Sequence, residues 1–383
     1  MNNLVDIKEW EQKRKTTFFV YMLLYFFAEF EKSINTATLW FYLTKLMKTN
    51  QPVLYYGLIS AAVYILPFLL SSVVARFADK TRRIKLIIII INFVSMLGSI
   101  LYVISVSPLF PFTGKLLNGC VIILQPLIIG ETARSYPSEE IQSKFAYLIV
   151  SATLGFMIGP CVVLPFAEID FCFGQLRVGY GNISGILLLV TIICIQCCVV
   201  CFAHDLSREY DMKEAASTDK SSSIIGDVSK SNGIKVVKKA FKSKVLMFMF
   251  ALTFSSVIGS ISSGRNFPFL VLNVLLMSYK WISAGLIFQG IGLLLPCLVV
   301  IKTKTGSVVV FWIGVLGQVS LVILLTCQYI FVSVHLFFSI KVAMLLLYLL
   351  TTIFVDFSEQ LFLVVAFSKL VSSQHQSYSE SKN

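Results

Sequence analysis

Several charged side chains lie within apolar segments of this sequence, where they could bind a solute or exchange a proton. Ionisable residues inside an apolar helix are costly and usually face a bundle interior or a water-filled cavity. We therefore interpret them as candidates for a cavity that binds a substrate or a coupling ion. The candidates are Glu29, Lys32, Lys115, Arg265, Asp356 and Glu359.

The spacing of these residues predicts which of them share a helix face. Glu29 and Lys32 are three residues apart and can form an ion pair, whereas Glu31 points elsewhere. Asp356 and Glu359 also share a face, and two such close carboxylates resist joint ionisation, which suits proton coupling. The alternative for each candidate is a structural ion pair or a charge that reaches the membrane surface.

Composition identifies the chain as a polytopic membrane protein. Of its 383 residues, 57% are hydrophobic and 14% charged, and the mean hydropathy is +0.82. A net charge of +12 would indicate nucleic-acid binding in a soluble protein. Here the basic residues fall mainly in loops and tails, as positive-inside topology requires. We therefore expect a lipid bilayer and a small molecule or ion as partners, and no nucleic acid.

The apolar segments predict an all-α protein of about ten transmembrane helices, six before a long polar segment and four after it. All basic loops fall on one side if the N-terminus is cytoplasmic, which also places the linker and the C-terminal tail there. The expected parts are an N-terminal bundle at 1–203, a linker at 204–243, a C-terminal bundle at 244–370 and a tail at 371–383. The predicted spans are roughly 17–43, 53–75, 86–106, 110–132, 145–166, 180–203, 244–275, 281–301, 307–331 and 335–367.

A tight basic turn joins the second and third predicted helices, at residues 75–85. It contains Asp79, Lys80 and Arg83. We expect Asp79 to accept hydrogen bonds from the start of the following helix, where a negative charge is favourable.

A second pattern lies in the fifth predicted helix, at Gly155, Gly159 and Pro160. Small residues four apart let another helix approach closely, and proline bends a helix. This pattern predicts a close helix–helix contact.

Three motifs, in this order, resemble the major facilitator superfamily. The basic turn resembles Gly-x-x-x-Asp-Arg/Lys-x-Gly-Arg-Lys, with Ala75 and Arg82 in place of the two glycines. Lys115 to Gly119 resembles the Arg-x-x-x-Gly of the fourth helix, and Gly155 to Pro160 resembles the Gly-x-x-x-Gly-Pro of the fifth. The resemblance implies the major facilitator fold, in which helices one, four, seven and ten line a central cavity.

That family usually has twelve helices in two halves, so the resemblance implies a second half without its last two helices. A truncated product and a divergent short form are both open interpretations. Shorter pieces resemble an endolysosomal branch of the superfamily, which implies an endolysosomal membrane protein implicated in anion (chloride) movement. These pieces are Thr38–Leu43, Thr132–Tyr136, Leu154–Pro160 and Phe367–Leu370.

Enzymatic activity is not expected. The chain has no Gly-x-x-x-x-Gly-Lys-Ser/Thr loop for nucleotides, and its three histidines are scattered. The cysteine group from Cys194 to Cys201 contains no histidine or carboxylate, so we expect no metal site and no cofactor. The sequence thus predicts a secondary transporter or anion-conducting protein, with a non-transporting protein of the same fold as the alternative; Arg265 favours an anionic substrate.

Overall fold

In the computed structural model, most of the described residues belong to the first of two compact units. This unit comprises Met1–Ser135, Tyr147–Leu206 and Gly264–Leu294, and the second comprises Tyr136–Ala146, Ser207–Ser263 and Leu295–Asn383. The structure describes residues 2–136, 138–166, 168, 170–173, 176–206, 271, 279–303, 316, 342–343, 345–350 and 352–353.

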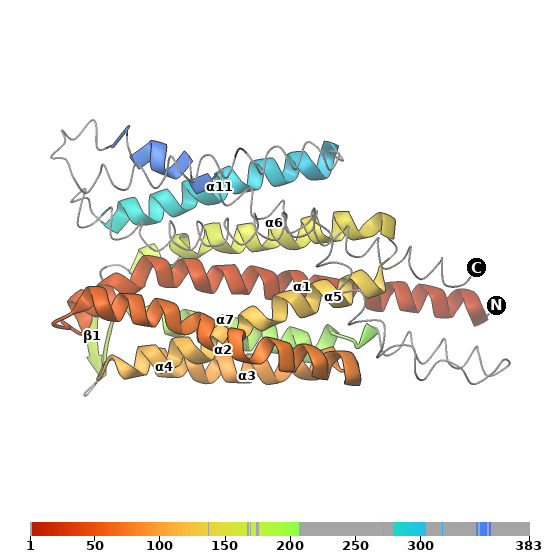
Figure 1. The fold of residues 1–383 in the computed structure, drawn as a ribbon, viewed down its shortest axis with the longest axis horizontal. Helices are drawn as coiled ribbons and strands as arrows, with labels where there is room; N and C mark the ends of the chain where they lie inside the picture. The colour runs from red at the N-terminus through yellow and green to blue at the C-terminus, as the bar shows by residue number, and fades with distance from the viewer. Residues whose placement is uncertain are drawn as a thin grey trace, which may run out of the picture. The chain divides into compact units, whose positions relative to one another are not determined.

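Long helices make up the first unit. Figure 1 shows α1, α2, α3, α4 and α7 extending side by side, and contacts join α3 to both α4 and α7, α2 to α4, and α1 to α7. The described α-helices are α1 (Asn2–Phe41), α2 (Pro52–Thr81), α3 (Ile84–Val103), α4 (Leu109–Asn118), α5 (Leu124–Ser135), α6 (Ser138–Val163), α7 (Ile183–Phe202) and α11 (Tyr279–Thr303). The start of α6 and the end of α11 belong to the second unit. A π-helical turn, η1 (Tyr42–Leu46), extends α1, and short 3-10 turns, η2 (Gly119–Ile123) and η3 (Leu164–Phe166), follow α4 and α6.

Among the described residues, five helical segments are long and apolar enough to cross a membrane. They are Pro52–Thr81, Ile84–Val103, Leu109–Ser135, Ser143–Phe166 and Ile183–Phe202. Each coincides with a span predicted from the sequence, and α4, η2 and α5 together form one of them. The helix α1 is not one of these five, because Glu29, Glu31 and Lys32 interrupt its apolar centre.

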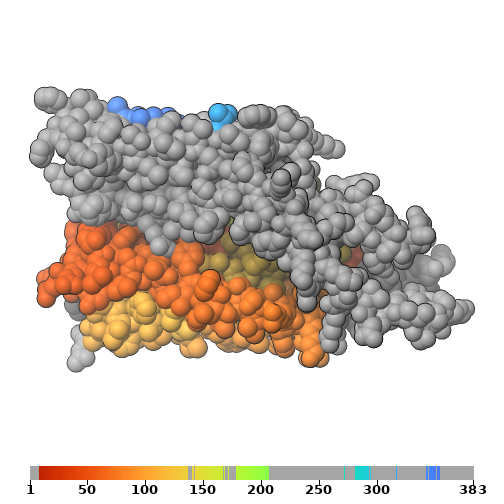
Figure 2. All heavy atoms as spheres, viewed as in Figure 1, coloured from red at the N-terminus to blue at the C-terminus, as the bar shows by residue number. Residues whose placement is uncertain are grey.

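The surface of α2 is apolar. Figure 2 shows this helix, in orange, on the viewed face of the molecule. Its exposed side chains include Leu58, Ile65, Phe68 and Val73. Such a face on a helix 30 residues long is what contact with lipid tails requires.

Glycine residues let α4 and the turn after it approach their neighbours. A Cβ atom at Gly98 of α3 would lie 2.7 Å from the carbonyl oxygen of Gly114 in α4. A Cβ atom at Gly119 of η2 would meet the backbone carbonyl of Val63 in α2. These positions admit only glycine, because helix backbones come this close only where a side chain is missing.

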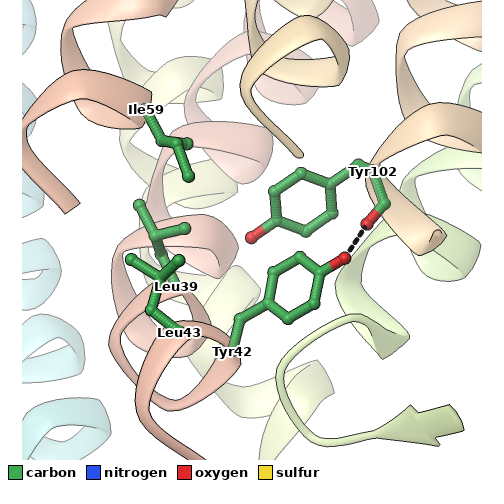
Figure 3. Close-up of a cluster of buried hydrophobic side chains, with 5 residues drawn as sticks. All are labelled: Leu39, Tyr42, Leu43, Ile59 and Tyr102. Carbon is green, nitrogen blue, oxygen red and sulfur yellow. Dashed lines mark hydrogen bonds between the residues drawn. The ribbon is translucent and has the colours of Figure 1, made fainter. Parts of the chain in front are cut away.

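A cluster of buried side chains closes one end of the first unit (Figure 3). The Tyr42 hydroxyl donates to the carbonyl oxygens of Tyr102 at 2.8 Å and Ile104 at 3.0 Å. These carbonyls lie at the end of α3, where the helix itself provides no donors. The cluster consists of Leu39, Tyr42, Leu43, Ile59 and Tyr102.

A short antiparallel hairpin precedes α7 at the same end. It pairs β1 (Asp170–Phe173) with β2 (Leu176–Gly179). Asn182, at the start of α7, is fully buried, and its Nδ2 donates to the Val103 carbonyl oxygen at 2.7 Å. The Asn182 side chain therefore joins the start of α7 to the end of α3.

Candidate functional site

A buried ion pair connects α1 with α4 inside the first unit. The Lys115 Nζ atom lies 3.0 Å from Glu31 Oε1, and the two side chains are only 5% and 8% exposed. The same ammonium lies over the ring of Tyr102 on α3, 5.4 Å from its centroid. Asn35, one turn after Glu31, donates from Nδ2 to the Glu31 carbonyl oxygen at 2.7 Å and faces the carboxylate at 3.5 Å.

This arrangement follows from the helix positions of the residues. Glu31 was expected to point away from Glu29, and it does, toward the interior of the unit. Lys115, a candidate from the sequence, is itself buried on α4, so its partner must come from the facing helix. The pair is internal to one unit, with α1, α3 and α4 around it.

A second ion pair lies on a more exposed face of α1. Lys32 Nζ is 3.3 Å from Glu29 Oε2, and the Lys32 side chain is 49% exposed while that of Glu29 is 19% exposed. The three-residue spacing had predicted that these side chains share a face. A charge exposed near the centre of a helix that packs among membrane spans requires water or protein around it rather than lipid.

The basic turn differs from its prediction. α2 continues to Thr81, so Asp79 and Lys80 lie in its last turn, and only Arg82 and Arg83 separate it from α3. Asp79 accepts no hydrogen bond from α3; its Oδ1 instead lies 2.6 Å from Arg134 Nη2 at the end of α5. The expectation that Asp79 caps the next helix is therefore wrong.

The acceptor at the start of α3 comes from a distant segment, at Asp205. The Lys85 backbone N–H donates to Asp205 Oδ1 at 2.7 Å. Asp79 cannot fill this role because the left-handed conformation of Arg82 (φ 55°) turns the chain between the two helices. Arg83 occupies the residue before α3 and provides no side-chain cap.

The glycines of α6 face α1. A Cβ atom at Gly155 would meet the carbonyl oxygen of Phe26, and one at Gly159 would meet the hydroxyl of Ser33. Ser151, one turn earlier, donates to the Met22 carbonyl oxygen at 2.7 Å. Pro160 lies inside α6. Thus α6 packs closely along the middle of α1, from Met22 to Ser33, on either side of Glu31 in sequence.

Sequence reasoning missed several buried polar residues. Glu131 on α5 is 1% exposed, although its segment was assigned to a helix end. Asn92 donates to Gln196 Oε1 at 2.8 Å, and Ser95 donates to Asn118 Oδ1 at 3.2 Å. The sequence did contain a signal for these contacts, since the apolar helices α3, α4 and α7 each carry a polar amide side chain: Asn92, Asn118 and Gln196.

Three candidate residues lie outside the described residues: Arg265, Asp356 and Glu359. They remain predictions from the sequence. Within the described part of the chain, no three histidine, cysteine or acidic side chains gather as metal ligands do.

Comparison with solved structures identifies the fold. A POT family transporter, solved with a thioalcohol-conjugated peptide, superimposes with a TM-score of 0.56 and 14% identity, over 92% of this chain and 88% of that one. The human organic anion transporter MFSD10 (TETRAN) gives a TM-score of 0.53 and 12% identity, over 93% of this chain and 92% of that one. No protein-family model and no curated protein sequence matches.

These likenesses define the class of fold. The protein is an all-α, polytopic integral membrane protein with the major facilitator fold. The fold class predicted from the three motifs and from the apolar segments is thereby confirmed.

Proposed function

We propose that the protein is a secondary transporter that moves a small anionic solute by alternating access across an endolysosomal-type membrane. The observation that carries the proposal is the exposed Glu29–Lys32 pair on α1. The two solved structures compared above are both named as transporters, which supports this use of the fold.

The position of Lys32 supports an aqueous path. α1 is flanked by α5, α6 and α7, which bury its other faces, among them Glu31, Ser33 and Asn35. Lys32 alone of these neighbouring residues has a strongly exposed side chain, at 49%. Placing a lysine ammonium in hydrocarbon costs free energy. A water-filled cavity that a solute can enter would avoid this cost for Lys32.

The charge of the proposed site favours an anion. Lys32 and, from the sequence, Arg265 provide positive charge, and water screens such an attraction less within a cavity. MFSD10 is named as an organic anion transporter, which agrees with this choice. The endolysosomal assignment rests on the pieces that resemble major facilitator superfamily domain-containing protein 8.

Acidic residues supply the proposed coupling. Glu29 holds Lys32 at 3.3 Å and competes with a bound anion for that ammonium. Protonation of the sequence-predicted pair of Asp356 and Glu359 would make the cavity more positive. Anion binding is then strengthened from an acidic compartment.

The two bundles of the proposed transporter are residues 1–203 and 244–370, joined by the cytoplasmic linker at 204–243. Alternating access would move these bundles relative to each other. Lys115 contributes to the proposed cavity indirectly. By binding Glu31, it fixes how α1 is rotated about its own axis and therefore where Lys32 points.

The experiment is uptake by purified protein in proteoliposomes. Labelled small anions, neutral solutes and cations are offered one at a time, with protein-free vesicles as the control. We expect saturable uptake of at least one anion and of no cation. Absence of uptake for all classes, by protein shown to be folded, would favour the non-transporting alternative.

A further inference from the structure

A line of buried polar side chains follows one face of α3 toward the Glu31–Lys115 pair. Asn92, Ser95 and Ser99 are at most 1% exposed and recur at the three- and four-residue spacing of a single helix face. Tyr102 continues this spacing one turn later, directly below the Lys115 ammonium. A polar stripe facing inward in an apolar helix must find its partners inside the bundle.

Contacts with two other helices extend the stripe. Asn92 donates to Gln196 of α7, and Ser95 donates to Asn118 at the end of α4. Asn118 lies one turn after Lys115, so the two side chains occupy the same face of α4. The stripe and the ion pair therefore form one continuous buried polar region.

This region contains polar atoms that no described residue satisfies. Asn92 Oδ1, Ser99 Oγ and Asn118 Nδ2 are buried without a hydrogen-bond partner in the described part of the chain, and so is Asn35 Oδ1 on the other side of the pair. The Lys115 ammonium has three N–H donors, of which Glu31 accepts one. Leaving such groups buried without a hydrogen-bond partner is unfavourable, so partners for them are expected.

We propose that ordered water molecules occupy this region and hydrate the buried Glu31–Lys115 pair. The unpaired atoms include both donors and acceptors, and water supplies both kinds of partner. Apolar groups supply neither, and a monatomic ion supplies only one. The inference goes beyond the proposed function and holds whether or not the protein transports a solute.

Hydration gives the ion pair a different character from a dry one. Two charges in a dry interior are held together, because separating them exposes each to an apolar environment. Water around Lys115 lowers that cost, so the pair can open without unfolding the unit. A hydrated Glu31–Lys115 pair can therefore break and re-form when the packing of α1 against α4 changes.

Radiolytic hydroxyl-radical footprinting of the purified full-length protein tests the inference without any substrate. X-rays generate radicals from bound water, and these modify aromatic side chains nearby. We expect Tyr102 to be modified rapidly although it is fully buried, while Phe27, only 1% exposed, stays close to background. Modification of Tyr102 at the Phe27 rate would overturn the inference.

A substitution pair provides the matched control. Asn118→Leu fills the region with an apolar group and should reduce Tyr102 modification severalfold. Thr191→Val removes a hydroxyl that only bonds within α7, to Leu187, and should leave Tyr102 modification unchanged. Equal modification of Tyr102 in wild-type and Asn118→Leu protein would overturn the inference. The wild-type comparison decides alone if Asn118→Leu does not fold.

Discussion

Lys85 donates two hydrogen bonds, one of them to Asp205, that hold the start of α3 to the end of α7 and the residues just after it. The Lys85 backbone N–H donates to Asp205 Oδ1 at 2.7 Å, and Lys85 Nζ donates to the Val200 carbonyl oxygen at 2.8 Å. A carboxylate thus meets the positive end of one helix and an ammonium the negative end of the other. The neighbouring His204 N–H donates to Thr17 on α1, so three helices fix the point where the chain leaves this unit.

We predict that Asp205→Ala lowers the free energy of unfolding by about 0.5–2 kcal/mol, the usual effect of losing a helix cap. Asp205→Asn keeps an acceptor and should cost less. Chemical unfolding in detergent is the measurement. Asp79→Asn is the control, because the Asp79–Arg134 pair is exposed and worth about 0–1 kcal/mol. A larger loss for Asp79→Asn than for Asp205→Ala would contradict this ranking.

The Glu31–Lys115 pair gives a second prediction. Glu31→Gln leaves a buried, unpaired ammonium and should cost about 3–5 kcal/mol, whereas Glu31→Gln combined with Lys115→Met should recover most of the loss. Unfolding of the three proteins in the same detergent provides the comparison. Glu29→Gln serves as the control at a partly exposed pair. The account fails here if the double variant is no more stable than Glu31→Gln.

The glycine contacts give a third prediction. Gly155→Ala places a Cβ atom against the α1 backbone and should destabilise by about 1–3 kcal/mol through overpacking. Gly57→Ala, with nothing within 4 Å of the added atom, should instead stabilise α2 by about 0.5–1 kcal/mol. Thermal unfolding of both variants is sufficient. Opposite shifts in melting temperature are expected, and shifts of the same sign would count against close α1–α6 packing.

Arg82 provides a fourth prediction. It adopts a left-handed conformation after α2, at one of the positions where the superfamily motif has glycine. Arg82→Gly should stabilise by up to about 1 kcal/mol, because it removes roughly 1–2 kcal/mol of left-handed strain and adds a smaller entropic cost of glycine in the unfolded chain. Arg83→Gly, where φ is −101°, should not stabilise. If both glycine variants lower stability equally, backbone conformation does not explain the position.

The fold could be predicted because its signals are local. Apolar length located the spans that the structure describes, and the order of three short motifs identified the fold class. Helix ends were less accurate: the turn at 75–85 lies mostly inside α2, since Asp79 and Lys80 carry no feature that stops a helix. The helix ends only where Arg82 turns left-handed, which composition does not indicate.

The partners of charged residues could be predicted only within one helix. Glu29 and Lys32 lie on one face by spacing alone. Glu31 meets Lys115 across 84 positions of sequence, and Lys85 meets Asp205 across 120, because these contacts depend on how helices are rotated and paired. A single sequence contains no local signal for either property.

The most direct test of the central claim is anion flux through reconstituted vesicles at pH 5 and pH 7. The protein should carry a small anion, faster from the acidic side, and Lys32→Gln should reduce the flux strongly at both pH values. Lys45→Gln is the matched control, since Lys45 lies beyond the end of α1 with its ammonium over the Phe41 ring. Flux of a cation, or anion flux that Lys32→Gln leaves unchanged, would contradict the proposed site.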